Sequence, residues 1–510
     1  QLIAVNLKKG KIYKDKEIKD YLSKDYKQFN KQIIHLDKKI TTEKEFANFS
    51  EEDLRRRQYL SGYSIEDLEL ILHPMVEDAK EATGSMGDDT PVAVLSNHYR
   101  PISHYFRQNF SQVTNPPIDS LRENKVMSLK TRFGNLGNIL DFENLTKENI
   151  YVLDSPILTN SQLKKFKTMF SKKIKVIDCT FNIKDNLRNR IEEIRDEAET
   201  AVRGGANHLI LSDQNISEER AIVPMILAVG ASHSHLVKLS LRGYASINVQ
   251  TAEAMDTHSF SVLIGVGATT VNPYLAIDSI FQRYEKKLFG ELDFPSCVER
   301  FKKSINAGLL KIMSKMGISV LSSYRGGCNF EAVGLSRGLV ADYFPGLISR
   351  ISGIGVSGIE KKIKELHFKT YQKNVVMLPI GGLYKYRKSG EEHQFQGNLI
   401  HLLQSSVGRN SYEIFKKYTK GINDLNPTNL RDLLEFRKIN KPLNIDDVEP
   451  IEKITPRFGS GSMSHGALSA EAHETLAVGM NRIKGSSCSG EGGEDEKRFK
   501  ALKNGDTSNS

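Results

Sequence analysis

Apolar and polar positions alternate with different periods along the chain, and these periods predict its elements. The segment "QLIAVNLKKGKIY" alternates around Gly10 and predicts a β-hairpin. Residues 51–82 have helical spacing, and Ser64 followed by Asp67 is typical of a helix start with a capping box. The first part of the chain is therefore predicted to hold a hairpin followed by helices.

Between residues 150 and 290, apolar runs of strand length alternate with helical patterns. The runs are "NIYVLDS", "KKIKVIDCTF", "NHLILSD", "YASINVQT" and "SVLIGVGA", and "VVMLPIGG" at 375–382 predicts one more buried strand. Near-continuous apolar strands separated by helices are typical of parallel sheets. We therefore predict an α/β fold with mostly parallel strands, in which functional groups lie at the C-terminal ends of the strands.

A second region follows Pro442 and Pro450, with a new unit starting near residue 450. Its segment "FGSGSMSHGALS" at 458–469 spaces glycines among small residues, so that backbone N–H groups can approach a ligand. Ser469 is the expected N-cap of a helix that ends at Gly485, with one buried stripe formed by Ala472, Leu476, Met480 and Ile483. The local pattern fits a cofactor at the mouth of an α/β barrel and a tight packing turn equally well.

Composition narrows the classes of partner. The 510 residues are 39% hydrophobic with a net charge of +10, but Lys and Arg alternate with Glu and Asp, as on solvated helix faces. No apolar run approaches the ~18–20 residues of a membrane span. We expect neither a nucleic-acid nor a membrane partner. The chain opens at Gln1 and ends in "NGDTSNS", which indicates an excerpt of a longer protein.

Cysteine and histidine spacing predicts no metal site. The four cysteines, Cys179, Cys297, Cys328 and Cys488, form no C-x-x-C pair and no Cys/His cluster. Such sparse cysteines favour a reducing, cytosol-like compartment. The "HSH" at 233–235 has no third ligand nearby, so a helical or surface role is expected.

Two glycine-rich segments carry weaker signals. "GIGVSG" at 353–358 matches the dinucleotide pattern G-x-G-x-x-G, but the preceding segment has a helical pattern and no acidic residue follows at the required spacing. "SSCSGEGGEDEKRF" at 486–499 carries carboxylates that would repel a phosphate. Its Glu491 suits a cation, an ammonium-like species or a general acid or base, and a solvated acidic turn is the alternative.

Several segments together resemble the large subunit of glutamate synthase, in the order of that family and over nearly the whole chain. They are "GSMGDDTPVAVLS", "FRQNFSQVTNPPIDSLRENKVMSL", "GANHLILSD", "VLIGVGATTVNPYLA", "KIMSKMGISVLSSYRG", "LRDLLEF" and "SMSHGALSAEAHETLAVGMNRIKG…GEGGED". The resemblance implies a tail of a glutaminase domain at 1–35, a central α/β domain at 36–440, and the truncated start of a (β/α)8 FMN barrel at 441–510.

The resemblance also implies an activity. Glutamate synthase is an oxidoreductase that carries glutamine-derived ammonia through a tunnel to 2-oxoglutarate, where reduced FMN completes the reductive amination. A [3Fe-4S] cluster brings electrons from an NAD(P)H-oxidising small subunit or from ferredoxin. None of the four cysteines here matches the cluster ligands. The implied location is the cytoplasm, or a plastid in a plant or alga.

Residue roles follow from the same resemblance. Gly461, Ser462, Met463 and Ser464 match the stretch along the FMN, and Glu491 matches the catalytic glutamate beside the tunnel exit. Met86 matches the loop near the synthase site, and Thr114 and Asn115 match the tunnel wall. Because Lys484, Ser486 and Cys488 depart from the family pattern "NR(I/L)GG(K/R)SN(T/S)GEGGED", no side-chain contact is carried over to them.

The isolated chain is expected to be inactive, since the glutaminase nucleophile and most of the barrel are not among its residues. Two alternatives stay open at this point. One is a non-catalytic α/β scaffold or docking module, and the other is a stand-alone FMN barrel oxidoreductase.

Overall fold

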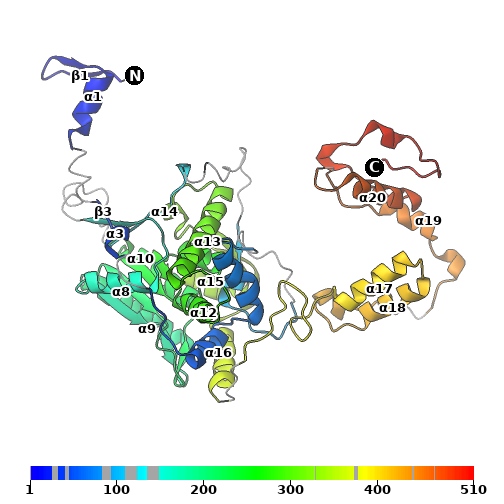
Figure 1. Cartoon of the computed structure of the whole chain (residues 1–510), viewed down its shortest axis with the longest axis horizontal. Helices are drawn as coiled ribbons and strands as arrows, with labels where there is room; N and C mark the ends of the chain where they lie inside the picture. Colours follow the sequence, from blue (N-terminus) through cyan, green and yellow to red (C-terminus); the bar gives the residue numbers. More distant parts are fainter. Residues whose placement is uncertain are drawn as a thin grey trace. The chain divides into compact units, whose positions relative to one another are not determined.

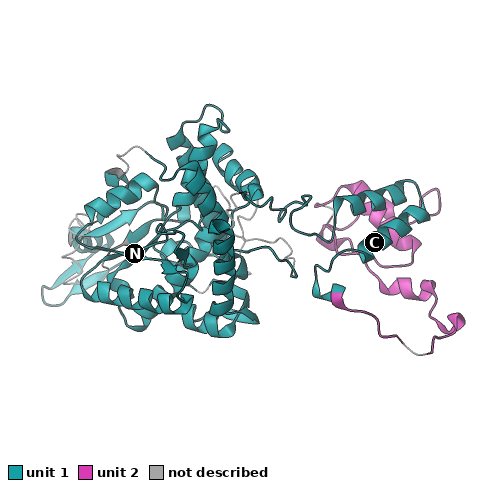
Figure 2. Cartoon of the chain, turned by 90° about the horizontal axis from the view of Figure 1, so that it is seen from below, with its two compact units in different colours: residues 1–432 teal, residues 433–510 magenta. Residues whose placement is uncertain are grey.

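The computed structural model describes residues 2–25, 33–40, 45–82, 94–109, 122, 125–134, 149–327, 329–372, 377–438, 441–464 and 466–510. The chain divides into two compact units, residues 1–432 and 433–510, which are coloured separately in Figure 2. In the part of the chain that is described, no helix is both long enough and apolar enough to span a bilayer.

The predicted hairpin at the start of the chain is confirmed. Strands β1 (Ala4–Asn6) and β2 (Lys11–Tyr13) pair antiparallel, and Gly10 turns the chain with a φ of +59°. Helix α1 (Asp15–Leu22) follows.

Four parallel strands form the central sheet of the first unit, in the order β12-β11-β9-β7. Their bounds are Ile174–Asp178 for β7, His208–Ser212 for β9, Ser246–Gln250 for β11 and Thr270–Asn272 for β12. Every residue of β9, β11 and β12 is buried. This arrangement confirms the predicted parallel α/β core.

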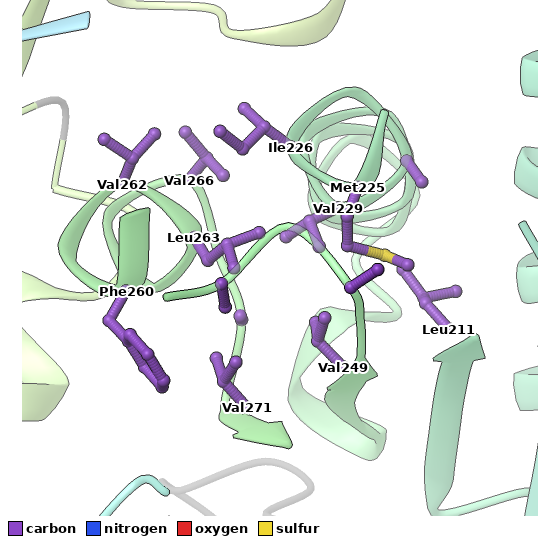
Figure 3. Close-up of a cluster of buried hydrophobic side chains, with 14 of the residues drawn as sticks. Leu211, Met225, Ile226, Val229, Val249, Phe260, Val262, Leu263, Val266 and Val271 are labelled. Carbon is purple, nitrogen blue, oxygen red and sulfur yellow. The ribbon is translucent and has the colours of Figure 1, made fainter. Parts of the chain in front are cut away.

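Three helices lie between successive strands of this sheet, and a fourth, α12, follows its last strand (Figure 1). They are α9 (Leu187–Arg203), α10 (Met225–Lys238), α11 (Thr257–Gly265) and α12 (Tyr274–Glu285). Figure 3 shows Met225 and Val229 of α10 and Leu263 of α11 beside Val249 and Val271 of the strands.

The segment "SVLIGVGA" at 261–268 was predicted to be a strand, and the prediction is wrong. Its first five residues form the end of α11, whose N-cap Asp256 accepts a hydrogen bond from the backbone N–H of Ser259. All nine residues of this helix are buried. A helix that is buried on every side has no polar face, so its apolar run resembles that of a buried strand.

Smaller sheets surround the central one. β13 (Phe330–Leu335) pairs in parallel with β14 (Ile348–Ile354) and antiparallel with β4 (Phe106–Gln108). β6 (Ile150–Leu153) lies between β3 (Ile33–His35) and β5 (Thr131–Phe133), and β8 (Thr180–Asn182) pairs with β10 (Arg220–Ile222).

Further helices complete the first unit. They are α3 (Asp37–Ile40), α4 (Glu51–Leu60), α5 (His73–Glu77), α8 (Asn160–Met169), α13 (Phe294–Lys315), α14 (Leu321–Tyr324), α15 (Arg337–Tyr343), α16 (Val356–Tyr371), α17 (Gly397–Gly408) and α18 (Tyr412–Asn423). The predicted capping box lies at the start of the helical run that continues through the π-helix η2 (Asp67–Leu72) into α5. It is confirmed, because the backbone N–H of Ser64 donates to Asp67 at 2.8 Å and the N–H of Asp67 donates to the Ser64 hydroxyl at 3.2 Å.

Two sequence predictions about strands are wrong. "GIGVSG" does follow a strand, since β14 ends at Ile354 and α16 begins at Val356. Gly353 is nevertheless required by packing, because a Cβ there would lie 2.1 Å from the carbonyl oxygen of Gly334. The buried strand predicted at 375–382 is not formed, since 377–382 is irregular and Met377 is 81% exposed, while 375–376 lie outside the described residues.

The second unit contains α19 (Ile451–Ile454), α20 (Ala470–Arg482) and two short turns, η8 (Gly490–Gly492) and η9 (Glu496–Phe499). Gly459 and Ser486 form a parallel bridge on either side of α20. The segments before and after α20 are therefore joined by an isolated bridge.

Candidate functional site

Three of the sequence-predicted site residues cannot be located. Met86, Thr114 and Asn115 lie outside the described residues.

Polar side chains do gather at the C-terminal ends of the central strands, but they bind one another. Asp213 is fully buried and accepts hydrogen bonds from the Thr251 hydroxyl at 2.6 Å and from the N–H of Ala252 at 3.0 Å. Burial raises the pKa of Asp213 to about 6. Arg57 of α4 donates to the carbonyl of Gln214 at 3.0 Å and covers this edge. These described groups therefore stabilise the fold.

Glu253 follows β11 and caps the neighbouring helix. Its carboxylate accepts a 2.6 Å hydrogen bond from the N–H of Met225, the first residue of α10. Burial raises the pKa of Glu253 to about 8. The charged form of this group is therefore disfavoured in the folded protein.

The "HSH" segment lies on α10, as expected for a helical role. His233 accepts a hydrogen bond from Arg242 at 3.1 Å, and His235 lies 2.8 Å from a carboxylate oxygen of Glu199. Burial, with the nearby charge of Arg242, lowers the pKa of His233 to about 3. Within the described residues, no group of three or more metal-ligating side chains is assembled.

The second unit brings together the two segments that sequence reasoning singled out. The backbone N–H of Ser460 donates to the carbonyl of Ser486 at 2.9 Å, and the N–H of Met463 donates to that of Cys488 at 3.3 Å. Residues 458–464 and 486–490 thus lie side by side, and α20 connects them along the chain. The segment expected along a flavin and the segment carrying Glu491 share one surface.

Gly490 lies against the backbone of the other segment. It has a φ of +65°, and a Cβ there would lie 3.3 Å from the backbone nitrogen of Ser464. Glu491 is the next residue and is exposed. The carboxylate of Glu491 therefore lies at the surface, one residue from the contact with Met463 and Ser464.

Gly461, Ser462 and Ser464 leave backbone groups available to a ligand. Their N–H groups donate to no acceptor among the described residues. A Cβ added at Gly461 would meet no atom within 4 Å. Because unpaired N–H groups beside open space suit an anionic or carbonyl oxygen, this stretch can hold the polar edge of a ligand.

Cys488 contributes a reactive group to the same surface. Its sulfur lies 3.1 Å from the hydroxyl oxygen of Ser462. The Ser462 hydroxyl and the N–H of Gly490 lower the pKa of the Cys488 thiol. The side chain is exposed, whereas Cys179 and Cys297 are buried.

The predicted apolar stripe of α20 is not buried. Leu476 is 41% exposed and Ile483 is 46% exposed, while His473 and Ala477 are 3% and 1% exposed. His473 donates to the carbonyl of Met463 at 2.9 Å. The buried side of the helix therefore carries His473 and Ala477, not the predicted stripe.

Sequence reasoning missed His473 and Arg498, which form a buried hydrogen-bond network behind the two segments. Arg498 donates to His473 at 2.8 Å and, through Nε, to the carbonyl of Ser508 at 2.8 Å. The only signal in the sequence was their position within the segments that carry the family resemblance.

Comparisons with known proteins identify two regions. The family model "Glutamate synthase central domain" matches residues 56–336, and "Conserved region in glutamate synthase" matches residues 393–508.

Relatives match over nearly the whole chain. A glutamate synthase [NADPH] large chain from Azospirillum brasilense is 54% identical over 100% of this chain and 34% of its own length. The corresponding chain from Bacillus subtilis is 39% identical over 99% of this chain and 33% of its own length. A ferredoxin-dependent glutamate synthase from Pyropia yezoensis is 38% identical over 98% of this chain and 34% of its own length. The chain spans about a third of the length of the curated relatives it matches.

Proposed function

The chain belongs to the glutamate synthase family, and from this we propose that it is part of an enzyme that makes L-glutamate from glutamine-derived ammonia and 2-oxoglutarate. In this proposal residues 1–35 end the glutaminase domain, 36–440 form the central domain, and 441–510 begin the FMN-binding barrel. Met86, Thr114 and Asn115 contribute to the ammonia tunnel and to the loop near the synthase site.

One observation carries the proposal for the second unit. The N–H groups of Gly461, Ser462 and Ser464, which have no acceptor in the described part of the chain, lie beside the loop that holds Glu491. These groups fit the polar edge of FMN, whose reduced form supplies a hydride to an imine. The stretch 461–464 would bind and orient the flavin.

Glu491 has the chemistry that the ammonia side of the site needs. An exposed carboxylate attracts an ammonium or iminium species by charge, and it can also hold or release a proton. We expect Glu491→Ala in the complete enzyme to uncouple glutamine hydrolysis from the reductive amination of 2-oxoglutarate. Unchanged coupling and an unchanged dependence on 2-oxoglutarate would remove Glu491 from this role.

Electron supply belongs to the same proposal. The relatives include both NADPH-dependent and ferredoxin-dependent enzymes, so the donor is either an NAD(P)H-oxidising subunit or ferredoxin. The [3Fe-4S] cluster would be held by residues outside this chain. The proposed location is the cytoplasm, or a plastid in a photosynthetic eukaryote.

Gly461→Ala in the complete enzyme tests the flavin stretch. Since a Cβ at Gly461 meets no atom within 4 Å, the variant should fold normally. The added methyl group would occupy space next to the flavin, and we expect FMN affinity to fall by about tenfold, which corresponds to about 1.4 kcal/mol.

The matched control is Gly479→Ala, on the helix α20, where a Cβ also meets no atom within 4 Å. FMN affinity should stay unchanged in this control. If Gly461→Ala binds FMN as tightly as the wild type does, the stretch 461–464 does not hold the cofactor.

A further inference from the structure

Two hydrogen bonds determine which ring nitrogen of His473 donates and which one accepts. Its Nε2 lies 2.9 Å from the carbonyl oxygen of Met463, which can only accept, so Nε2 carries the proton. Its Nδ1 lies 2.8 Å from Nη1 of Arg498, which can only donate, so Nδ1 is unprotonated. The two bonds together fix the orientation of the imidazole ring.

Arg498 extends this network to the glycine-rich loop. Its Nη2 lies 3.8 Å from Oε1 of Glu494, and the two side chains are 3% and 6% exposed. Glu494 lies three residues after Glu491, and its Oε1 accepts a 2.8 Å hydrogen bond from the N–H of Ser510. Arg498 also donates to the carbonyl of Ser508. The guanidinium thus joins α20, the loop and the segment 508–510.

The contacts close a ring around the two proposed site segments. On one side, Gly490 packs against Met463 and Ser464. On the other side, His473 fixes the Met463 carbonyl, and Arg498 connects His473 to Glu494. Any change in the His473–Arg498 contact therefore alters the spacing between the flavin stretch and the loop.

We propose that His473 and Arg498 are positioning residues that set the distance between the flavin stretch 461–464 and Glu491. This inference rests on the proposed function of those two segments. His473 and Arg498 touch neither ligand, and they act through the Met463 carbonyl and the Glu494 carboxylate.

Network energetics support a role that goes beyond filling space. A buried guanidinium is costly unless its N–H groups are bonded. Here the Ser508 carbonyl and the His473 imidazole accept hydrogen bonds from Arg498, and the Glu494 carboxylate forms an ion pair with it at 3.8 Å. Removing one member deprives its buried neighbours of a hydrogen-bond partner, so the loss is larger than that of one exposed hydrogen bond.

Two substitutions of one residue separate positioning from packing. In His473→Gln, the amide can donate to Met463 and accept from Arg498, as the imidazole does. In His473→Met, the volume is kept but both hydrogen bonds are lost. The complete enzyme should be purified in each form, and three quantities should be measured: the FMN dissociation constant, the melting temperature, and the hydrolysis ratio, which is glutamine hydrolysed divided by 2-oxoglutarate consumed.

We expect His473→Gln to stay within about twofold of the wild type in FMN affinity and in the hydrolysis ratio. His473→Met should bind FMN about tenfold more weakly, as expected for the loss of buried hydrogen bonds, and its hydrolysis ratio should rise at saturating FMN. A purely structural role would lower the melting temperature of His473→Met and leave that ratio unchanged, which would overturn the inference.

Arg498→Lys is the second variant. If His473→Met does not fold, Arg498→Lys tests the inference on its own. It keeps the positive charge but cannot contact His473, Ser508 and Glu494 together. Its hydrolysis ratio should also rise, and an unchanged ratio would contradict the inference. If the purified wild-type enzyme contained no FMN, the proposed function itself would be refuted. That result differs from an unchanged hydrolysis ratio in the variants, which would refute only the positioning role.

Discussion

Lys484→Gly should stabilise the end of α20, although it removes a side chain. Lys484 has a φ of +58°, in the left-handed region that L-residues other than glycine adopt at a cost. It occupies the position just after the C-cap Ile483, where the helix is closed by two hydrogen bonds. The N–H of Lys484 donates to the carbonyl of Asn481 at 3.0 Å, and the N–H of Gly485 donates to that of Met480 at 2.9 Å. This pattern is a Schellman motif, which favours glycine at the position that Lys484 occupies.

The magnitude follows from two opposing terms. Left-handed backbone costs an L-residue roughly 1–2 kcal/mol, and the greater freedom of glycine in the unfolded chain costs roughly 0.5–1 kcal/mol. The Lys484 side chain is exposed, so little else is lost. The net gain is about 0.7 kcal/mol, or roughly threefold in an opening equilibrium.

Hydrogen exchange of the Lys484 and Gly485 amide positions measures this gain locally. Lys484→Ala is the control, because it removes the same side chain and keeps the Cβ that causes the strain. We expect slower exchange at residue 485 in Lys484→Gly only. Equal exchange in the two variants would show that backbone strain at residue 484 does not limit the stability of this helix end.

Other predictions test the first unit and the cysteine. Gly353→Ala should destabilise the first unit by at least about 2 kcal/mol in urea unfolding, since the added Cβ would lie 2.1 Å from a backbone oxygen. Gly338→Ala is the control and should not destabilise the unit, because a Cβ there meets no atom within 4 Å. The folded-state pKa of Glu253 is raised to about 8 from 4.5. The free energy of unfolding should therefore fall by up to about 1.4 kcal/mol per pH unit as the pH rises from about 5 to 8. Glu253→Gln should flatten that part of a profile of melting temperature against pH. Maleimide should label Cys488 before Cys179 and Cys297, because burial raises the pKa of the Cys297 thiol to about 11 and also raises the pKa of Cys179 well above its ordinary value. Ser462→Ala should slow the labelling of Cys488, as peptide mapping would detect.

The central sheet could be predicted because its strands differ in pattern from the helices between them. "NHLILSD" and "YASINVQT" are short apolar runs with polar ends, and both became strands, β9 and β11. "SVLIGVGA" failed because α11 lies wholly inside the core, where a helix needs no polar face. The strand before "GIGVSG" was missed for the opposite reason: five of the seven residues of β14 are exposed, so no buried run marked it.

The candidate site could be predicted only in part. Glycine spacing singled out 458–469 and 486–499, and the structure brings these segments side by side. Helical periodicity in α20 gave the correct interval between apolar residues but not the buried side of the helix. That side is set by His473, whose two ring nitrogens both find partners, so burial of a polar side chain costs less than periodicity alone suggests.

The two units therefore depend on different interactions. The first unit has an extensive apolar core that includes β9, β11, α10 and α11. In the described part of residues 433–510, Ala477 is the one fully buried hydrophobic side chain, whereas His473, Arg498 and Ser508 are buried polar residues. An apolar core tolerates small changes of shape, because many contacts share the loss. A polar network does not, because each member satisfies the others. Substitutions that remove a hydrogen-bonding group at His473 or Arg498 should therefore disturb the proposed flavin surface more than conservative changes of side-chain volume in β9 or β11 disturb the central sheet.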